Sequence, residues 1–339
     1  MALKVVVVGA GHRGRDWLRE VRASPAYELA AFVDDDRAVL QDAASSLDIP
    51  SPQCFAELDK ALDQNECDAV IVASSADRHV RPCKTALSRK LAVLVEKPFT
   101  LRLEEATKLV ALAEQSGVPL LVAQNFRYMR AFRTARRLIQ DGTLGRVGMV
   151  TFQYYRVPHE MASSLARLEH SVLWGIGVHH LDALRFVLGG RVTGVVADSY
   201  TTPWGELPPG ASLRVMLSFD NGTRASYSAT YESSGHEFFE RGQEFYGRFV
   251  GEKATLHVFQ RWLLLCARGK LPRVVRRGSR SVTEEGILLR QLERALLAGE
   301  ASDSSGRDNL QTMAIVEACV RSATEHRWID PRELLNESD

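Results

Sequence analysis

The chain has 339 residues, which is enough for two domains of ordinary size. Its composition, 45% hydrophobic and 25% charged, is typical of a globular protein and excludes a disordered or fibrous one. The formal net charge of +1 gives no reason to expect nucleic acid or a membrane surface as a partner.

The cysteines indicate the compartment. The five of them are scattered along the chain and form no C-x-x-C pair: Cys54, Cys67, Cys83, Cys266 and Cys319. This pattern favours reduced thiols over a disulfide framework or a zinc site. No apolar run reaches membrane-spanning length, and the first one leads straight into a glycine turn rather than a cleavage site. We expect a cytoplasmic protein without a metal centre.

The N-terminal segment carries a dinucleotide-binding pattern. An apolar run at residues 3–8 predicts a buried parallel strand, and Gly9, Gly11 and Gly14 follow it as G-x-G-x-x-G. These glycines allow a tight turn, close approach to a pyrophosphate, and close packing of helix on strand. The helix that opens at the turn offers free N–H groups to the phosphates.

The acidic residue at the end of the second predicted strand bears on the cofactor. Asp34 lies 20 residues after Gly14, where a carboxylate accepts hydrogen bonds from the adenosine ribose. A carboxylate there repels a 2′-phosphate, so we expect NAD rather than NADP. Arg37 lies close by and weakens that preference, although we favour the interpretation of Arg37 as an exposed arginine at the start of a helix.

The alternation of strands and helices continues to about residue 126. Strands are predicted at 67–74, 91–98 and 118–126, and helices at 79–90 and 103–117. Together they predict a doubly wound parallel sheet, a Rossmann fold, in which ligands bind beyond the carboxyl ends of the strands. The residues at those ends are 74–79, 96–98 and 124–128.

Lys97 is the strongest candidate for chemistry among these strand-end residues. It follows an apolar strand and precedes Pro98, which holds it out of helical geometry. A desolvated lysine has a lowered pKa and exchanges a proton readily near a reacting carbonyl. An exposed lysine paired with Glu96 is the alternative interpretation.

The second half reads as strands with separate helices. A strand is predicted at 145–155, a hairpin at 211–231 with its turn at 220–222, and two short strands at 247–259. Helices are predicted at 287–299 and 310–326. This pattern predicts an α+β domain with a mostly antiparallel sheet, over residues 126–339, after a first domain over 1–125. The C-terminal helix is a candidate to pack back on the first domain.

Seven segments occur in an order that resembles a known family. They are "VVVVGAGHRG", "VDDD", "VIVASSADRH", "VLVEKPF", "VAQNFRY", "GRVGMV" and "GIGVHHLDALRFVLG". Nearly the whole chain is similar to the glucose-fructose oxidoreductase, inositol dehydrogenase and MocA family. The resemblance implies NAD or NADP and the oxidation or reduction of a sugar, cyclitol or related polyol. It also implies a homodimer or homotetramer formed through the open face of the second domain's sheet.

The pattern and the resemblance together assign candidate residues. Lys97 and His179 are expected at the reacting centre, as the groups that exchange protons with the substrate. The residues expected to order the substrate site are Asp182, His180, Arg127 and Tyr128. Those expected along the cofactor are Gly9, Gly11, His12, Arg13, Gly14, Asp34, Ser74, Ser75, His79, Glu96, Lys97 and Asn125.

The stretch 171–189 carries the predicted acid–base group. A flexible Gly-x-Gly turn is expected to precede an amphipathic helix with His179 in its first turn, and Asp182 shares its face at i+3. Gly175 stands where the family's Asp-x-Gly-x-His-x-x-Asp pattern has its first aspartate. His180, Glu160 and Glu169 are candidates to supply the missing polar group.

Three functions therefore remain open. The first is an NAD(P)-dependent sugar or polyol dehydrogenase. The second is an NAD-dependent glycosidase that oxidises, eliminates and re-reduces its substrate. The third is a sensor that binds the nucleotide without turnover.

Overall fold

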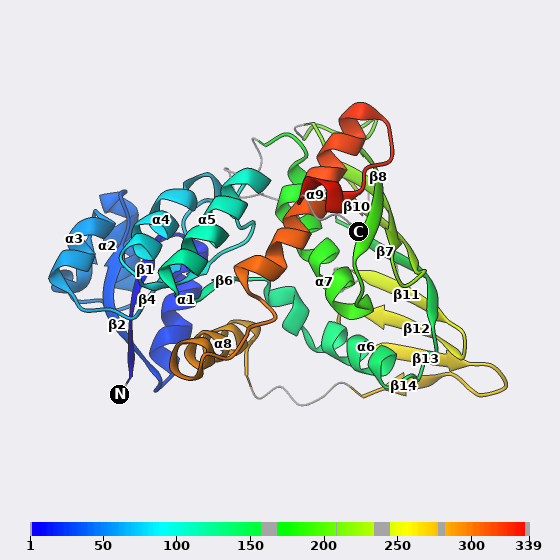
Figure 1. Cartoon of the computed structure of the whole chain (residues 1–339), viewed down its shortest axis with the longest axis horizontal. Coiled ribbons are helices and arrows are strands. Elements are labelled where there is room, and N and C mark those ends of the chain that lie inside the picture. The colour runs from blue at the N-terminus through cyan, green and yellow to red at the C-terminus, as the bar shows by residue number, and fades with distance from the viewer. Residues whose placement is uncertain (1, 157–167, 208, 234–244, 277–281, 336–339) are drawn as a thin grey trace. The chain divides into compact units, whose positions relative to one another are not determined.

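The structure is a computed structural model that describes residues 2–156, 168–207, 209–233, 245–276 and 282–335. The chain forms two compact units (Figure 1). The first comprises Met1–Asn125 with Val282–Leu310, and the second comprises Phe126–Ser281 with Gln311–Asp339. Residues 282–310, which the sequence analysis assigned to the second domain, thus belong to the first unit.

The first unit is built on a six-stranded parallel sheet with the order β3-β2-β1-β4-β5-β6. Its strands are β1 (Leu3–Val8), β2 (Tyr27–Val33), β3 (Cys54–Phe55), β4 (Ala69–Val72), β5 (Ala92–Val95) and β6 (Leu120–Val122). The central strands are almost wholly apolar because both faces of the sheet are covered. The strand order reverses between β1 and β4, which is where a doubly wound sheet binds its ligand.

Helices cover both faces of this sheet. They are α1 (His12–Ala23), α2 (Arg37–Ser46), α3 (Leu58–Gln64), α4 (Val80–Ser88), α5 (Leu103–Ser116) and α8 (Glu284–Ala298). Right-handed crossovers place α1 on one face and α3, α4 and α5 on the other. Helix α4 lies beside α5, and α8 lies beside α1 (Figure 1).

The returning segment is bound to the edge strand of this sheet. The N–H of Val122 donates to the carbonyl of Ser304 at 2.8 Å, and the Ser304 hydroxyl donates to the carbonyl of Val122 at 2.9 Å. Leu121 also forms a bridge with Ser305. These bonds satisfy the free edge of β6, which gives a physical reason for the return of residues 282–310.

The second unit contains an eight-stranded sheet with the order β14-β13-β12-β11-β7-β10-β9-β8. Neighbouring strands are antiparallel except β7 and β10, which are parallel. The predicted hairpin is present, with its turn at residues 220–222. The strands are β7 (Val147–Tyr155), β8 (Val192–Tyr200), β9 (Ser212–Phe219), β10 (Arg224–Thr230), β11 (Tyr246–Gly251), β12 (Ala254–Phe259), β13 (Leu263–Ala267) and β14 (Arg273–Val275).

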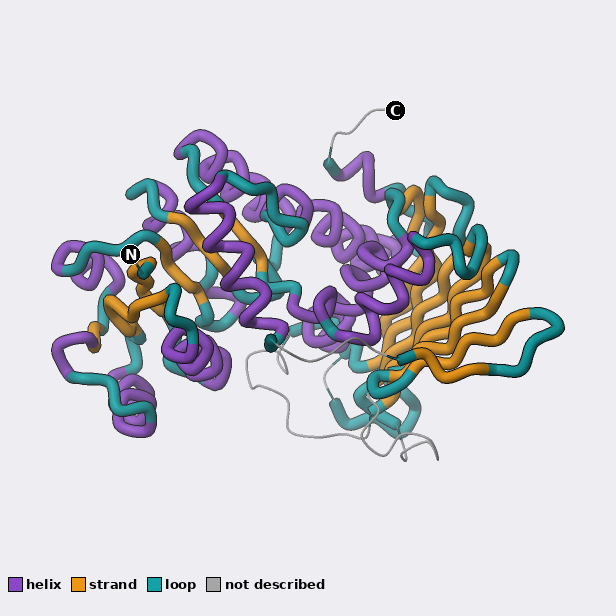
Figure 2. Tube along the Cα trace, turned by 90° about the horizontal axis from the view of Figure 1, so that it is seen from below, coloured by secondary structure: helices purple, strands orange, loops and turns teal. Residues whose placement is uncertain are grey.

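The helices of the second unit lie on one face of this sheet (Figure 2). They are α6 (Arg130–Gln140), α7 (Val178–Leu188), α10 (Pro331–Leu334) and the part of α9 (Gly306–Glu325) that follows Leu310. The opposite face carries exposed apolar side chains, including Met149 and Met216. The core of the unit therefore lies between the helices and one face of the sheet.

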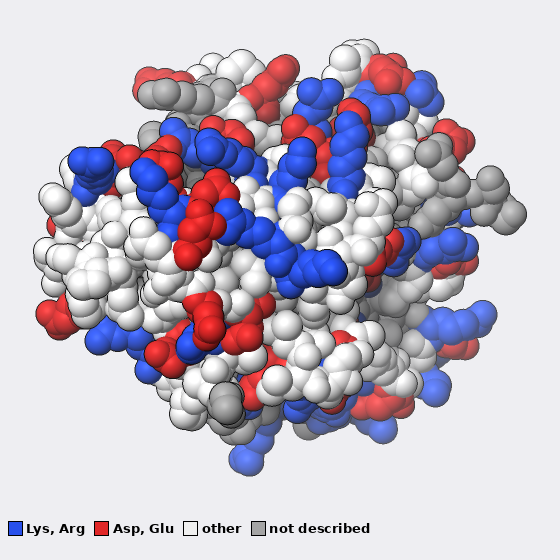
Figure 3. Space-filling model, turned by 60° about the vertical axis from the view of Figure 1, so that its left-hand side comes forward, with Lys and Arg blue, Asp and Glu red and all other residues white. Residues whose placement is uncertain are grey.

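The surface carries both signs of charge. On the face shown in Figure 3, Lys and Arg side chains are interspersed with Asp and Glu, in keeping with the net charge of +1. In the part of the chain that the structure describes, we find no helix of the length and apolar character needed to cross a membrane.

Candidate active site

The three glycines of the first turn have three different surroundings. Gly9 adopts φ +103, and a Cβ added to it would lie 2.5 Å from the backbone N of Ser74. A Cβ on Gly14 would lie 1.7 Å from the carbonyl oxygen of Gly9. A Cβ on Gly11 would meet no atom within 4 Å among the described residues. Gly9 and Gly14 thus serve internal packing, whereas Gly11 borders open space into which a ligand fits.

The surroundings of this turn fit a dinucleotide. Helix α1 begins at His12 with Gly11 as its N-cap, so its first N–H groups point into the open space. The Asp34 carboxylate accepts from the N–H of Ala10 at 2.6 Å and from that of Asp36 at 2.9 Å, which fixes it at the end of β2. The buried hydroxyl oxygen of Ser74 has no hydrogen-bond partner among the described residues. A ligand with hydroxyl and phosphate groups complements all three features.

Three predicted cofactor residues belong to a partly buried polar network. Arg13 binds Glu96 with an Nη2–Oε1 distance of 2.7 Å and binds Glu285 of α8 at 3.0 Å. Glu96 also accepts from the indole of Trp17 at 2.8 Å, and Asn125 donates to Glu285 at 3.0 Å. The network joins α1, the end of β5 and α8. Glu285 and Trp17 escaped the sequence analysis because no local pattern links them to the strand ends.

Lys97 follows this network at the end of β5. Its backbone N–H donates to Glu96 at 3.1 Å, and the other Glu96 oxygen is bound by Arg13 and Trp17. Desolvation lowers the pKa of Lys97 to about 8, with Glu96 opposing the shift and Arg13 adding to it. The ammonium group therefore loses its proton near pH 8, well below the pH at which an exposed lysine does.

His79 was expected along the cofactor, but both nitrogens of its ring lie beside main-chain carbonyl oxygens of the protein. Nδ1 lies 3.0 Å from the carbonyl oxygen of Pro98, and Nε2 lies 2.9 Å from that of Ser74. Both ring nitrogens thus lie within hydrogen-bonding distance of main-chain carbonyl oxygens, and the buried ring lies between the loop after β4 and the loop after β5. His79 acts on the cofactor site by holding Ser74 beside the segment that carries Lys97.

The remaining first-unit candidates flank the turn. His12 is exposed at the start of α1 and contacts Asp16 at 3.2 Å. Ser75 is half-buried and is the N-cap of a short 3-10 helix, η2 (Ala76–Arg78).

In the second unit, the prediction of a flexible Gly-x-Gly turn before the helix is wrong. Residues Leu173–Gly177 form a π-helical turn, η4, that continues directly into α7. The N–H of Val178 reaches back five residues to the carbonyl of Leu173, which is the π pattern. A Cβ on Gly175 would lie 2.5 Å from the hydroxyl oxygen of Tyr231. Glycine stands at this position because the Tyr231 phenol occupies the space of a side chain.

The amphipathic character predicted for the following helix is also wrong. Residues 178–185 of α7 are all buried, including the polar ones. His179 is 5% exposed, and its ring stacks on Phe126 with centroids 4.1 Å apart. His180 is fully buried, and its Nδ1 lies 2.8 Å from the hydroxyl of Tyr227, whose pKa burial raises. The two adjacent histidines thus have different surroundings, and His180 belongs to the core against β10.

Asp182 binds Arg127 rather than His179. Its carboxylate accepts from Arg127 Nε at 2.5 Å and from Nη2 at 2.6 Å, and from the Thr312 hydroxyl at 2.6 Å. Arg185 lies 4.0 Å away, and among the described residues these are the polar contacts of Asp182. Asp182 is completely buried and Arg127 is 2% exposed. The pair fixes η3 (Asn125–Tyr128) against α7 and α9, so any effect of Asp182 on His179 passes through the backbone.

The other expected site residues of this unit lie elsewhere. Tyr128 is buried with its ring edge toward Phe186 at 6.2 Å, which makes it a core residue. Glu169 is exposed, and Glu160 lies outside the described residues. Within the described residues, Tyr231 is the polar side chain that fills the space beside Gly175.

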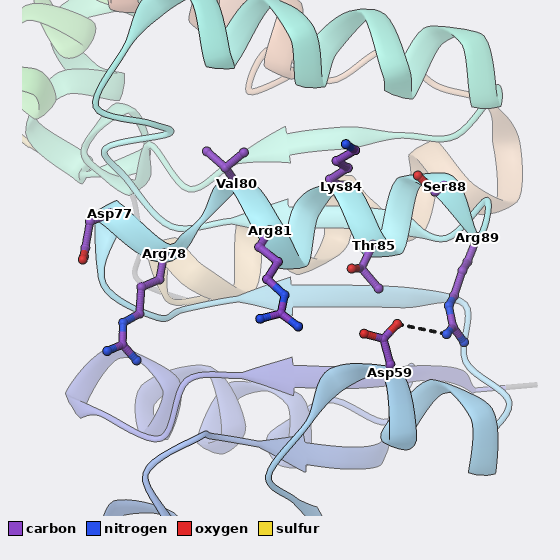
Figure 4. Close-up of a pocket in the computed structure, with 9 residues that line it drawn as sticks. All are labelled: Asp59, Asp77, Arg78, Val80, Arg81, Lys84, Thr85, Ser88 and Arg89. Atoms are coloured by element: carbon purple, nitrogen blue, oxygen red, sulfur yellow. Dashed lines mark hydrogen bonds and ion pairs between the residues drawn. The ribbon is translucent and has the colours of Figure 1, made fainter.

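A separate hollow of about 600 Å³ runs along α4 (Figure 4). Arg78, Arg81, Lys84 and Arg89 line it, and Arg89 pairs with Asp59 at 3.0 Å. Its lining includes neither the glycine turn nor Lys97, and it is open to solvent. It is a feature of the basic surface of α4 and not part of the candidate site.

The first unit defines the class of protein: it is the nucleotide-binding domain of an oxidoreductase. The family profile described as "Oxidoreductase family, NAD-binding Rossmann fold" matches residues 3–124. The profile of the GFO/IDH/MocA C-terminal domain matches residues 132–257. The chain belongs to the GFO/IDH/MocA oxidoreductase family.

Several known proteins are similar to it. A D-apiose dehydrogenase of Paraburkholderia graminis is 28% identical, over 98% of this chain and 90% of its own length. An inositol 2-dehydrogenase of Arthrobacter is 31% identical over 57% of this chain and 56% of its own length. The crystal structure of an Agrobacterium radiobacter oxidoreductase, in complex with NAD+, L-tartaric acid and magnesium, is 22% identical. It has a TM-score of 0.87 and covers 98% of this chain and 100% of its own.

Proposed function

We propose that the protein transfers a hydride between NAD and a hydroxyl-bearing carbon of a sugar, cyclitol or related polyol, with Lys97 and His179 at the reacting centre. The observation that carries the proposal is the pKa of Lys97, lowered to about 8 at the carboxyl end of β5. The names of three relatives support the substrate class: D-apiose dehydrogenase, inositol 2-dehydrogenase and 1,5-anhydro-D-fructose reductase.

The bound dinucleotide supplies the hydride acceptor or donor. Oxidation of an alcohol also requires removal of the hydroxyl proton, and a neutral amine at Lys97 accepts it. In the opposite direction the protonated amine returns the proton to the forming hydroxyl. Because the pKa of Lys97 is about 8, both forms are accessible near neutral pH.

His179 is the second group assigned to the substrate. Its ring is held by Phe126, so its orientation is fixed before any substrate arrives. A histidine in this position shares with Lys97 the general acid–base role at the reacting hydroxyl. His180 serves as an internal comparison because it lies next in the chain and its Nδ1 is engaged by Tyr227.

The pH profile tests this assignment. We expect kcat/KM for alcohol oxidation to rise with pH through an apparent pKa of about 8, because the base must be neutral. Lys97→Met should abolish that limb and lower turnover by about two orders of magnitude or more, while NAD affinity measured by calorimetry stays within about threefold. A Lys97→Met enzyme with normal turnover would refute the assignment.

Paired histidine variants and a substrate panel separate the competing functions. His179→Ala should lose most of the turnover, whereas His180→Ala should mainly lower stability. Release of an aryl leaving group with only catalytic NAD would identify a glycosidase. Tight NAD binding without turnover of any polyol or any aryl glycoside would identify a sensor.

We also propose that the exposed face of the eight-stranded sheet binds a second copy of the chain. The strand register aligns one row across the whole sheet, from Val196 and Met216 at one side to Leu264 and Val274 at the other. Met216 is 60% exposed and Met149 is 58% exposed on this face, and apolar side chains that gather on one exposed face mark an interaction surface. Light scattering should show that Met216→Arg yields monomers. The equally exposed Leu297, on α8, gives the control Leu297→Arg.

NAD preference and a cytoplasmic location complete the proposal. Asp34 favours NAD over NADP because its carboxylate is fixed where a 2′-phosphate would lie. All five cysteines are free thiols in the structure, which suits a reducing compartment.

A further inference from the structure

The first unit contains a buried side-chain amide, at the end of β6, to which the site described above gives no role. Gln124 is 1% exposed, and neither its Oε1 nor its Nε2 has a hydrogen-bond partner among the described residues. Buried polar atoms are nearly always hydrogen-bonded, so a side chain with both atoms unsatisfied requires an explanation. A bound group that offers one donor and one acceptor would satisfy both.

Gln124 lies at the same edge of the sheet as Lys97. Val95 of β5 pairs with Val122 of β6, and the N–H of Ala123 donates to the carbonyl of Val95 at 2.8 Å. Lys97 lies two residues after Val95, and Gln124 lies two residues after Val122, the pairing partner of Val95 on the neighbouring strand. Both follow the carboxyl end of their strand, where a doubly wound sheet binds its ligand.

The direction of the dinucleotide follows from the first unit alone. The uncapped start of α1 takes the pyrophosphate, and Asp34 at the end of β2 takes the adenosine ribose. The other half of the molecule must then extend across the opposite half of the sheet, over the ends of β4, β5 and β6. This course brings the nicotinamide to the strand ends that carry Lys97 and Gln124.

We infer that Gln124 binds the carboxamide of the nicotinamide ring. A carboxamide offers a carbonyl oxygen and an NH₂ group, the same pair of groups as the glutamine side chain. Nε2 of Gln124 donates to the carboxamide oxygen, and Oε1 accepts from its N–H. This pairing fixes the rotation of the ring and thereby the face that it presents. The inference rests on the NAD-binding domain and not on the identity of the substrate.

Asn309 provides a matched control in the same unit. It is also 1% exposed, and both polar atoms of its side chain lack a partner among the described residues. It differs from Gln124 in position, because it lies in the first turn of α9 and not at the end of a strand. A general effect of buried amides would appear in variants of both residues, whereas a carboxamide contact would appear only at Gln124.

The test measures binding of three dinucleotides by calorimetry, without turnover. They are NAD+, 3-acetylpyridine adenine dinucleotide, in which a methyl group replaces the carboxamide NH₂, and ADP-ribose, which lacks the ring. The wild type should bind NAD+ about tenfold more tightly than the acetylpyridine analogue, the usual effect of one lost hydrogen bond at a buried partner. Gln124→Met should bind the two equally, and its affinity for ADP-ribose should be that of the wild type. Asn309→Leu should keep the tenfold preference.

Two results would overturn the inference. One is a Gln124→Met protein that still prefers NAD+ tenfold, and the other is loss of the preference in Asn309→Leu instead. If Gln124→Met does not fold, Gln124→Glu serves, because a carboxylate accepts from the carboxamide N–H but cannot donate to its oxygen. That variant should bind NAD+ more weakly than the wild type and keep its preference over the analogue. Unchanged affinities for both dinucleotides would count against the contact. Failure of the proposed catalytic roles would leave these affinities unaffected.

Discussion

Removing the Asp182 carboxylate should destabilise the second unit strongly. The carboxylate is completely buried and takes two hydrogen bonds from Arg127, which is itself 2% exposed. Asp182→Asn keeps the size of the side chain but removes the charge that binds the buried Arg127 guanidinium through Nε and Nη2. Breaking a buried ion pair from one side costs about 3–5 kcal/mol, so we expect a loss of that order in the free energy of unfolding.

A double-mutant cycle separates the pair from its surroundings. Arg127→Met and Asp182→Leu each remove one partner of the pair, whereas the double variant replaces both charges by apolar groups of similar size. The double variant should be more stable than the sum of the single effects predicts, by about 2 kcal/mol or more. Urea unfolding followed by circular dichroism and by tryptophan fluorescence measures all four proteins.

A surface pair of the same unit provides the control. Glu317 and Arg321 form an i,i+4 pair on α9 at 2.9 Å, with both side chains partly exposed. Glu317→Gln should cost less than about 1 kcal/mol, because water screens the pair and solvates the remaining arginine. Asp182→Asn costing no more than Glu317→Gln, or strictly additive effects in the cycle, would refute the reasoning.

Three further predictions follow from the glycines and from Asp34. Gly11→Val should abolish NAD binding in calorimetry while leaving the thermal midpoint within a few degrees, because the new side chain meets ligand space and no described protein atom; a variant that still binds NAD would place the pyrophosphate elsewhere. Gly175→Ala should lower the free energy of unfolding by about 1–3 kcal/mol, because its Cβ would lie 2.5 Å from the Tyr231 hydroxyl, and Gly175→Ala combined with Tyr231→Phe should recover much of the loss. Gly148→Ala, which meets no described atom within 4 Å, is the matched control, and equal costs at the two positions would contradict the explanation. Asp34→Asn should shift the ratio of NADP to NAD affinity toward NADP by about tenfold, since it removes the repelling charge and keeps an acceptor for Ala10; an unchanged ratio would mean that another group selects the cofactor.

The first unit could be predicted well because its signals are local. A run of β-branched residues, three glycines at fixed spacing and an acid after the next strand are all read within 34 residues, and each has a steric or electrostatic cause. The structure gives Gly9, Gly11 and Gly14 the three surroundings that the pattern requires. The lowered pKa of Lys97 was expected for the same reason, since desolvation follows from a position at the end of a buried strand.

The second unit was predicted less well because its site depends on contacts between distant residues. Asp182 and Arg127 are 55 residues apart, and Asp182 and Thr312 are 130 apart. The sequence places Asp182 at i+3 from His179, which is correct along the helix, but it does not show that a buried arginine competes for the carboxylate. The π-helical turn was also missed, and the tight space at Gly175 within it is set by Tyr231, which follows β10 and is 56 residues away in the sequence.

The segment Asn125–Tyr128 shows how much can be concluded from a position at the end of a strand. Four consecutive residues after β6 have four different partners: Asn125 binds Glu285, Phe126 stacks on His179, Arg127 pairs with Asp182, and Tyr128 lies against Phe186. The position of the segment at the carboxyl end of a strand marks it as functional, but it does not distinguish a residue that touches ligand from one that holds its neighbour. Burial and pairing make that distinction. Arg127 pairs with Asp182 and Tyr128 packs against Phe186 inside the second unit, next to Phe126, whose ring stacks on His179. Among the described residues of this stretch, Gln124 has both amide atoms unsatisfied and Asn125 has its Oδ1 unsatisfied, and Gln124 is the one that we assign to a ligand.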